Sequence, residues 1–251
     1  GQLANLSSRL KALRGGSRGF SMAGMSYDSS NEYASLNHSK PMSGGGASAD
    51  QVGGYSRWGG FLNADFGYGS KAPTVFEDAY DFDGSKITFG ADYRYDESWV
   101  IGLIGGLVDQ EIDFDATQSI VDGGIETDGY SVMPYLLFQN DLYYASVSIG
   151  LQNQSVDMTR YIKYPSLNLN VDNVNTIAVS STDASVVSFF AEFGYSYQNR
   201  GFVLEPFISV SHSSTTIDAF RERDIKDEAF DLTVGKQKVD SLETSFGVKL
   251  Q

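Results

Sequence analysis

The chain of 251 residues contains no cysteine and only two histidines, His38 and His212. Without cysteine there can be no disulfide, no thiolate nucleophile and no cysteine-ligated metal. Two histidines are too few for a histidine-rich metal site and give a His-based catalytic triad little to build on. The length suits one large domain or two small ones. Composition therefore argues against several common kinds of enzyme site.

Long apolar runs are also missing, since none approaches the ~18–20 residues of a membrane helix. Hydropathy alone would predict a soluble protein, but membrane β-barrels conceal their apolar residues in alternation. Basic residues are outnumbered, with 18 Lys and Arg against 32 Asp and Glu and a net charge of −14. Nucleic acid is therefore not an expected partner, because phosphate contact needs a basic patch. The opening GQLANLSSRL has no signal-peptide core, so we expect Gly1 to be either an artificial boundary or a cut end.

The first 14 residues predict a short basic amphipathic helix. Apolar residues recur at helical spacing in QLANLSSRLKALR and form one stripe made of Leu3, Leu6, Leu10 and Leu13. Arg9, Lys11 and Arg14 lie off this stripe, and Gly15–Gly16 ends it. The spacing alone fits a helix on a soluble core equally well. Residues 15–54 are rich in Gly and Ser, which predicts an irregular connector.

From Trp58 onward the pattern changes to strict apolar–polar alternation, which predicts β-strands. Eight stretches show it: 58–68, 86–95, 99–107, 129–139, 142–154, 186–198, 203–213 and 241–251. The polar positions hold Gly, Ser, Asn and Gln with isolated charges, a composition that suits a confined, wet lumen. A soluble sandwich also alternates, but its polar face tends to be rich in Lys, Glu and Thr.

Aromatic residues gather on the apolar face near the strand ends, beside short turns at 96–98, 140–141 and 199–201. Rings with a polar tip are typical of a membrane–water boundary. We expect these residues to form an aromatic girdle: Tyr93, Tyr95, Trp99, Phe138, Tyr143, Tyr195 and Tyr197.

Connections alternate between those short turns and longer stretches at 70–84, 114–127, 160–184 and 216–239. Outer-membrane barrels have short periplasmic turns and long extracellular loops. Backbone groups in lipid must all be paired, so such a sheet has to close. The predicted fold is all-β, a transmembrane antiparallel up-and-down β-barrel over residues 55–251.

Three motifs resemble the translocator (β) domain of a monomeric autotransporter of the type V secretion system. NLSSRLKALRGGSRGFS resembles the linker helix and the Gly-rich stretch after it, and RWGGFLNADFGYGS resembles the first strand. GYSYQNRGFVLEPFISVSHS resembles a strand–turn–strand unit with a Glu-Pro. The resemblance covers nearly the whole chain and implies that residues 1–14 form an α-helix inside the barrel lumen.

The family barrel has twelve strands and a C-terminal aromatic residue, whereas this chain shows about eight strands and stops at Leu250–Gln251. We therefore expect residues 55–251 to lack their last strands. A complete eight-stranded barrel is the alternative, because eight strands can close. Side chains fill such a barrel, which would leave no room for a helix.

The resemblance implies a Gram-negative outer-membrane protein that exports an N-terminal passenger to the cell surface, with no cofactor and no metal. It implies as partners outer-membrane lipid and lipopolysaccharide, the barrel assembly machinery, periplasmic chaperones and the covalently linked passenger. Without the resemblance, a stand-alone surface barrel acting as adhesin, receptor or small porin stays open. An enzyme is the third reading, although no Gly-x-Ser-x-Gly motif is present. A soluble sandwich is the fourth.

Opposite charges give the helix a separate reason to lie in the lumen. Its basic residues attract acids more strongly in a confined channel than in bulk water. The predicted lumen charges facing it are Asp65, Asp92, Arg94, Glu192, Glu205 and Glu243. The alternative is that these groups are simply solvated, in which case ion pairs contribute little.

Two further possibilities concern acidic residues. Some family members cut their own linker with lumen acids and an Asn pair, but this helix has only Asn5. Asp65, Asp92, Glu192 and Glu205 would be the acid–base candidates. The stretch 109–128 holds seven acids and no base. It could collect Ca²⁺, but it lacks EF-hand spacing and predicts a solvated surface loop instead.

Overall fold

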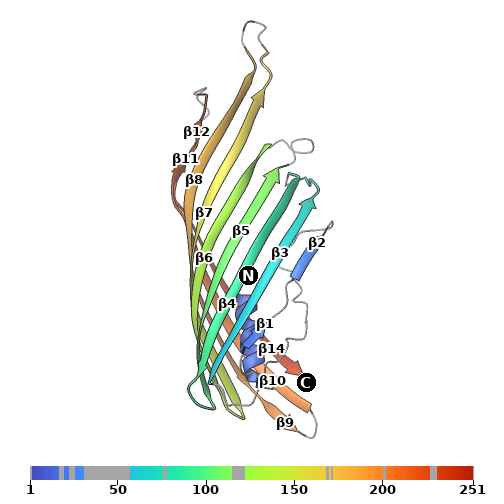
Figure 1. Cartoon of the computed structure of the whole chain (residues 1–251), viewed down its shortest axis with the longest axis vertical. Coiled ribbons are helices and arrows are strands. Elements are labelled where there is room, and N and C mark those ends of the chain that lie inside the picture. The colour runs from blue at the N-terminus through green and yellow to red at the C-terminus, as the bar shows by residue number, and fades with distance from the viewer. Residues whose placement is uncertain are drawn as a thin grey trace.

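The computed structural model describes residues 2–16, 20–22, 26–30, 57–75, 78–114, 122–167, 170, 172–199, 202–226 and 231–250. Its main elements are one helix and a long curved sheet (Figure 1), and β11 (Phe220–Arg221) and β13 (Thr233–Val234) form a separate two-stranded sheet. The helix is α1 (Gln2–Arg14), and the long strands are β3 (Trp58–Lys71), β4 (Tyr80–Arg94), β5 (Trp99–Phe114), β6 (Asp122–Gln139), β7 (Tyr143–Tyr164), β8 (Val174–Tyr195), β10 (Phe202–Ile217) and β14 (Gln237–Leu250).

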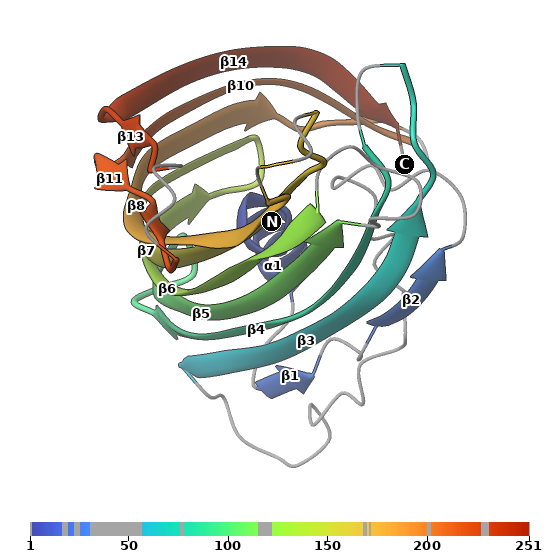
Figure 2. The ribbon, with the colours of Figure 1, turned by 90° about the horizontal axis from the view of Figure 1, so that it is seen from above.

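These long strands follow one another around the sheet, each antiparallel to the next. The wall curls around α1, as Figure 2 shows. β1 (Phe20–Met22) and β2 (Ser26–Ser30) pair with β3 in parallel, inside the segment where the sequence predicts an irregular connector. Most of that connector lies outside the described residues. Among the described strands, no pairing joins β14 to the β3 end of the sheet.

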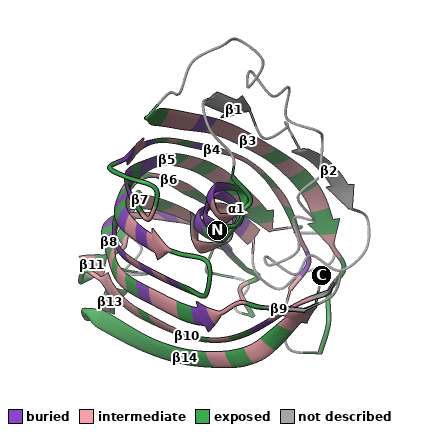
Figure 3. Ribbon diagram, turned by 90° about the horizontal axis from the view of Figure 1, so that it is seen from below, coloured by how far each residue is buried: buried purple, intermediate pink, exposed green. Residues whose placement is uncertain are grey.

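Period-two alternation divides the wall into a concave face toward α1 and an outward face. Exposed positions recur along the strands of the wall (Figure 3). Many of those on the outward face are large apolar residues: Phe89, Ile101, Leu103, Leu107, Val132, Ile149, Leu151, Val187, Phe193, Ile208 and Phe246. Soluble monomers rarely expose so many large apolar side chains on one face. This is the pattern of a sheet whose outer surface meets lipid.

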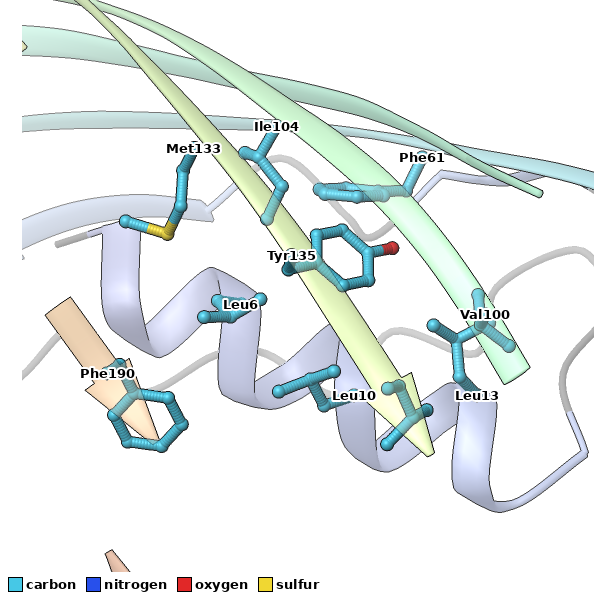
Figure 4. Packing of buried hydrophobic residues seen from close by; sticks show 10 residues of the cluster. Leu6, Leu10, Leu13, Phe61, Val100, Ile104, Met133, Tyr135 and Phe190 are labelled. Carbon is cyan, nitrogen blue, oxygen red and sulfur yellow. The ribbon is translucent and has the colours of Figure 1, made fainter. Parts of the chain in front are cut away.

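The core lies between α1 and the concave face (Figure 4). Leu6, Leu10 and Leu13 are buried along one side of the helix, and Leu3 packs at the edge of the same cluster. The wall contributes Phe61, Val100, Ile104, Met133, Tyr135, Leu137 and Phe190. The predicted inner face of Gly, Ser, Asn and Gln with isolated charges is therefore wrong opposite α1, where apolar side chains pack against the helix. A leucine stripe leaves water only if it meets an apolar surface.

Local hydrogen bonds explain where elements end. Gly15 and Gly16 donate their backbone N–H groups to Lys11 and Leu13, and Gly16 has a φ of 86°, which stops the helix in a left-handed cap. In the turn after β4, Asp96 Oδ1 accepts from the backbone of Ser98 and Trp99.

The turn after β6 repeats the device, because Asn140 Oδ1 accepts from the backbone of Leu142 and Tyr143. A side chain that closes its own turn makes a compact connection between two strands. The turn predicted at 199–201 lies mostly outside the described residues.

The long connections are shorter than the sequence predicts, because the strands continue past the apolar belt. Residues 109–114 belong to β5 and 122–128 belong to β6, so the acidic stretch is mostly paired sheet and not a loop. The strands stay paired beyond the apolar belt, because a hydrogen-bonded ladder needs only a neighbouring strand and not a membrane.

Proline interrupts the wall locally. The β6–β7 ladder passes from Val132–Leu151 to Tyr135–Ser148 and omits Met133 and Pro134, of which the proline cannot donate a ladder hydrogen bond. On β10, pairing with β8 starts at Phe207, immediately after Pro206. No helix within the described ranges is long and apolar enough to span a bilayer.

Candidate functional site

Aromatic rings on the concave face lie over glycines of the neighbouring strand. Tyr135 of β6 covers Gly102 of β5, and a Cβ at Gly102 would come within 2.2 Å of Tyr135 Cζ. Tyr144 of β7 covers Gly194 of β8 in the same way, with 2.2 Å from that Cβ to Tyr144 Cε1. Both tyrosines are buried. Only glycine leaves room for these rings to lie along the wall, which prepares two aromatic platforms for α1.

The first platform holds Arg9. Arg9 donates to Asp92 Oδ2 from Nε at 2.8 Å, and its Nη2 lies 2.7 Å from the same oxygen. Tyr135 donates its hydroxyl to this oxygen at 3.1 Å, and the Phe61 ring centroid lies 5.4 Å from Arg9 Cζ. The two charged side chains are only 3% and 5% exposed. We call Asp92, Tyr135 and Phe61 the Asp92 cradle.

The second platform holds Arg14. Arg14 Nη2 donates to Glu205 Oε1 at 2.8 Å, and Arg14 Cζ lies 3.3 Å from the centroid of the Tyr144 ring. Ser196 donates its hydroxyl to Glu205 Oε1 at 2.7 Å and so fixes the carboxylate from the other side. We call Glu205, Ser196 and Tyr144 the Glu205 cradle.

A third contact anchors the N-terminal half of the helix. Asn5 Nδ2 donates to Thr88 Oγ1 at 2.9 Å, while Asn63 Nδ2 donates to Asn5 Oδ1 at 3.2 Å. Asn63 also donates to Asp65 Oδ2 at 3.3 Å. Together with the two cradles, this contact ties α1 to β3, β4, β6, β7 and β10.

The remaining predicted charges are distributed unevenly. Glu192 is 3.3 Å from Lys249 Nζ on β14, and Glu243 is exposed and accepts from Ser245. Lys11 is exposed on the helix. Arg94 is buried at the turn end of β4, and its Nη2 has no hydrogen-bond partner among the described residues. The structure thus joins Arg9 and Arg14 to Asp92 and Glu205, and joins neither of them to Glu243.

Sequence reasoning missed several members of the site: Phe61, Asn63, Tyr135, Tyr144, Ser196 and Lys249. One signal was available for the rings. Tyr135 and Tyr144 occupy polar-face positions in strands whose neighbours carry glycine there, and an aromatic residue on a lumen face needs such a gap. The ion-pair partners could not be found this way, because they lie up to 191 positions apart in the sequence.

The predicted girdle residues lie at the turn end of the wall. Trp99 and Phe138 have ring centroids 4.8 Å apart, and Tyr143 lies 5.1 Å from Tyr195. Tyr93 packs against Trp58 at 5.0 Å, which adds a tryptophan that the prediction omitted. Tyr95 and Tyr197 are exposed near the same end. Cross-strand ring pairs of this kind also hold the antiparallel register.

An acidic patch lies on the outward face beyond the apolar belt, which ends on β5 at Leu107. Cross-strand partners are Asp81 with Asp113, Asp83 with Glu111, Glu111 with Glu126, and Asp109 with Asp128. Repulsion from Asp113, followed by desolvation and the other acids nearby, raises the pKa of Glu111. Among the described residues, no group of His, Asp and Glu has an arrangement that could hold a metal ion.

Replacing Glu111 by Gln should therefore raise the melting temperature modestly at neutral pH. The folded carboxyl binds its proton more readily than the unfolded one, so the native state gains stability as pH falls through the raised pKa. The advantage of E111Q should accordingly disappear at mildly acidic pH. Melting curves of both proteins at the two pH values test this, with E97Q in an exposed turn as the control. An E111Q advantage that is the same at both pH values would contradict it.

The features described so far define a class of protein. An antiparallel wall with an apolar outer belt, aromatic rings at the turn end and a helix against the inner face is an outer-membrane β-barrel domain. The family model described as "Autotransporter beta-domain" matches residues 60–251. The chain therefore belongs to the autotransporter β-domain family and to the bacterial outer membrane.

A solved structure supports the fold. The translocator domain of autotransporter NalP from Neisseria meningitidis aligns with a TM-score of 0.52 at 16% identity, covering 68% of this chain and 55% of that chain. The chain thus spans about half the length of that domain. The outer membrane transporter YddB from Escherichia coli aligns with a TM-score of 0.43 at 7% identity, covering 69% of this chain and 26% of that one. No curated protein sequence matches the chain.

Proposed function

We propose that this domain anchors an N-terminal passenger in the outer membrane and supports its export to the cell surface. The supporting observation is the seat of α1: Arg9 and Arg14 each contact an acid and an aromatic ring of the inner face. The helix is the segment that follows the passenger, so its place inside the wall is where the linking chain would cross the membrane.

Export is tested by surface digestion. A reporter domain joined upstream of residue 1 should be degraded by protease added to intact cells, and a matched fusion lacking β5 to β7 should leave it protected. If the reporter stays protected in both, the export role is wrong.

Gel electrophoresis of the same reporter fusion, without added protease, tests for linker cleavage. We infer that the domain is not an enzyme and that the linker stays uncut, because both functional groups of the Asn5 amide are engaged with Thr88 and Asn63. The reporter should therefore migrate attached to the barrel. A free reporter that becomes attached in N5A would show self-cleavage.

We further propose that α1 acts as a plug and that further strands complete the wall between β14 and β3. Charged side chains in a lumen affect ion flow directly, and the buried pair holding Arg9 keeps the helix in place. The rim of aromatic residues at the turn end would mark the periplasmic boundary of the bilayer. The barrel assembly machinery and periplasmic chaperones would deliver the domain, and lipopolysaccharide would contact its outward face.

Replacing both Arg9 and Arg14 by Ala should raise single-channel conductance severalfold, because the plug loses its two charged anchors. K11A serves as the control, since Lys11 is exposed. Planar-bilayer recordings of the full-length chain measure the effect. Equal conductance in R9A/R14A and the parent would contradict a charge-held plug.

A further inference from the structure

We propose that the Glu205 cradle is a guanidinium-selective site, which recognises arginine in the exported chain and sets the depth at which that chain stops. This inference rests on the proposed function. The first support is the ring contact: Arg14 Cζ lies 3.3 Å from the centroid of the Tyr144 ring. At this distance the guanidinium stacks on the ring face. A planar, weakly hydrated cation does this better than an ammonium.

The Glu205 carboxylate keeps one oxygen available to a forked donor. Glu205 is 7% exposed, and its Oε1 accepts from both Arg14 Nη2 and Ser196 Oγ. Its Oε2 is buried and has no hydrogen-bond partner among the described residues. Two N–H groups of one guanidinium can reach both oxygens of a carboxylate, whereas an ammonium acts as a point charge. The cradle therefore has an acceptor position that arginine can use and lysine uses poorly.

The wall itself contains the comparison cation. Lys249 of β14 lies beside the same ring, but its Nζ is 5.7 Å from the Tyr144 centroid. It approaches the Tyr144 hydroxyl at 3.4 Å and Glu192 at 3.3 Å, and it lies over the Phe207 ring at 4.4 Å. The neighbouring ammonium thus contacts Glu192, Phe207 and the Tyr144 hydroxyl, whereas the Arg14 guanidinium is the cation that lies closest to the Tyr144 ring.

The two cradles together define how far the exported chain extends into the lumen when it stops. Arg9 and Arg14 are five residues apart on α1, and they contact opposite parts of the wall, β4 and β10. Lys11, which lies between them, is exposed. A passing polypeptide would meet both cradles at once only where two arginines recur at this spacing. The pair therefore favours one resting position of the chain.

The site is tested by chemical rescue of R14A in the full-length chain, with single-channel conductance as the readout. R14A and R14K should both conduct more than the parent. Methylguanidinium should restore the block of R14A at a concentration about tenfold lower than methylammonium, because stacking and forked hydrogen bonding favour the planar cation. In Y144L/R14A this preference should be lost.

Helix depth provides a second readout that does not depend on ion flow. A cysteine pair made by Asn5→Cys and Thr88→Cys replaces side chains that are hydrogen-bonded at 2.9 Å, in a chain with no other cysteine. Cross-linking of this cysteine pair should be efficient in the protein that retains Arg14. It should be reduced when R14A is added and restored by methylguanidinium.

Three results would overturn the site: R14K blocking as well as Arg14, equal rescue by both cations, or a preference that survives in Y144L/R14A. Each presumes a blocked parent protein. Free conduction by the parent, together with no cross-linking in the N5C/T88C protein that retains Arg14, would instead contradict the proposed seat of the helix. Failure of the site and failure of the proposed function are therefore distinguishable.

Discussion

Replacing Asp92 by Ala is expected to give the largest loss of stability of any single charge change in this domain. Arg9 would remain on a helix face where its side chain is 3% exposed, without the Asp92 carboxylate that accepts from its Nε. Removing one partner of a buried ion pair costs about 3–5 kcal/mol, because the other charge is left uncompensated. Tyr135 would lose its hydrogen-bond acceptor at the same time.

Heat-modifiable gel mobility in detergent measures the loss, since folded barrels migrate differently from unfolded ones. E243A is the matched control, because Glu243 is an exposed acid on the wall that does not contact α1. The double variant R9M/D92L should recover most of the lost stability, because an apolar pair of similar volume can replace a buried ion pair. If D92A unfolds at the same temperature as E243A, the Asp92 cradle does not hold the helix.

Replacing Gly102 by Ala is expected to impair folding and to loosen the helix together. The new Cβ would fall 2.2 Å from Tyr135 Cζ and 2.5 Å from its hydroxyl oxygen. The ring cannot stay in place, because it is buried between α1 and the wall, so its hydrogen bond to Asp92 must break. Overpacking of this kind typically costs about 1–3 kcal/mol, to which the loss of the Asp92 hydrogen bond adds.

A compensating change separates crowding from other effects. In G102A/Y135L the smaller side chain should relieve the clash and recover part of the stability. G67A is the control, since a Cβ at Gly67 has no heavy atom within 4 Å. Folding yield and gel mobility after refolding measure both variants. Equal yields for G102A and G67A would show that the ring over Gly102 is not a constraint.

Much of the wall could be predicted from alternation alone, because strand parity assigns each residue to one face. Alternation predicts Asp92 and Glu205 on the inner face, and both side chains contact α1. The leucine stripe likewise identified the buried side of the helix. Parity is a local property, so single strands are enough to reveal it.

Pairing between distant residues could not be predicted in the same way. The stagger of the strands and the position of α1 along the lumen decide which acid contacts which arginine. Neither of these produces a periodic pattern in the sequence. The rings over Gly102 and Gly194 depend on the register of neighbouring strands. Strand length beyond the apolar belt was also missed, because acidic residues such as Asp109 and Glu111 resemble a loop in sequence while their backbones remain paired.

Spin-label accessibility tests the central claim most directly, namely that the outward face meets lipid and the concave face encloses α1 and water. Labels on cysteines replacing Leu103 and Ile149, which are outward and about half exposed, should be relaxed by oxygen and not by a water-soluble nickel complex. A label replacing Ser213 on the inner parity of β10 should show the opposite preference. If nickel reaches the labels at 103 and 149 as readily as it reaches 213, the outward face is not in lipid and the account is wrong.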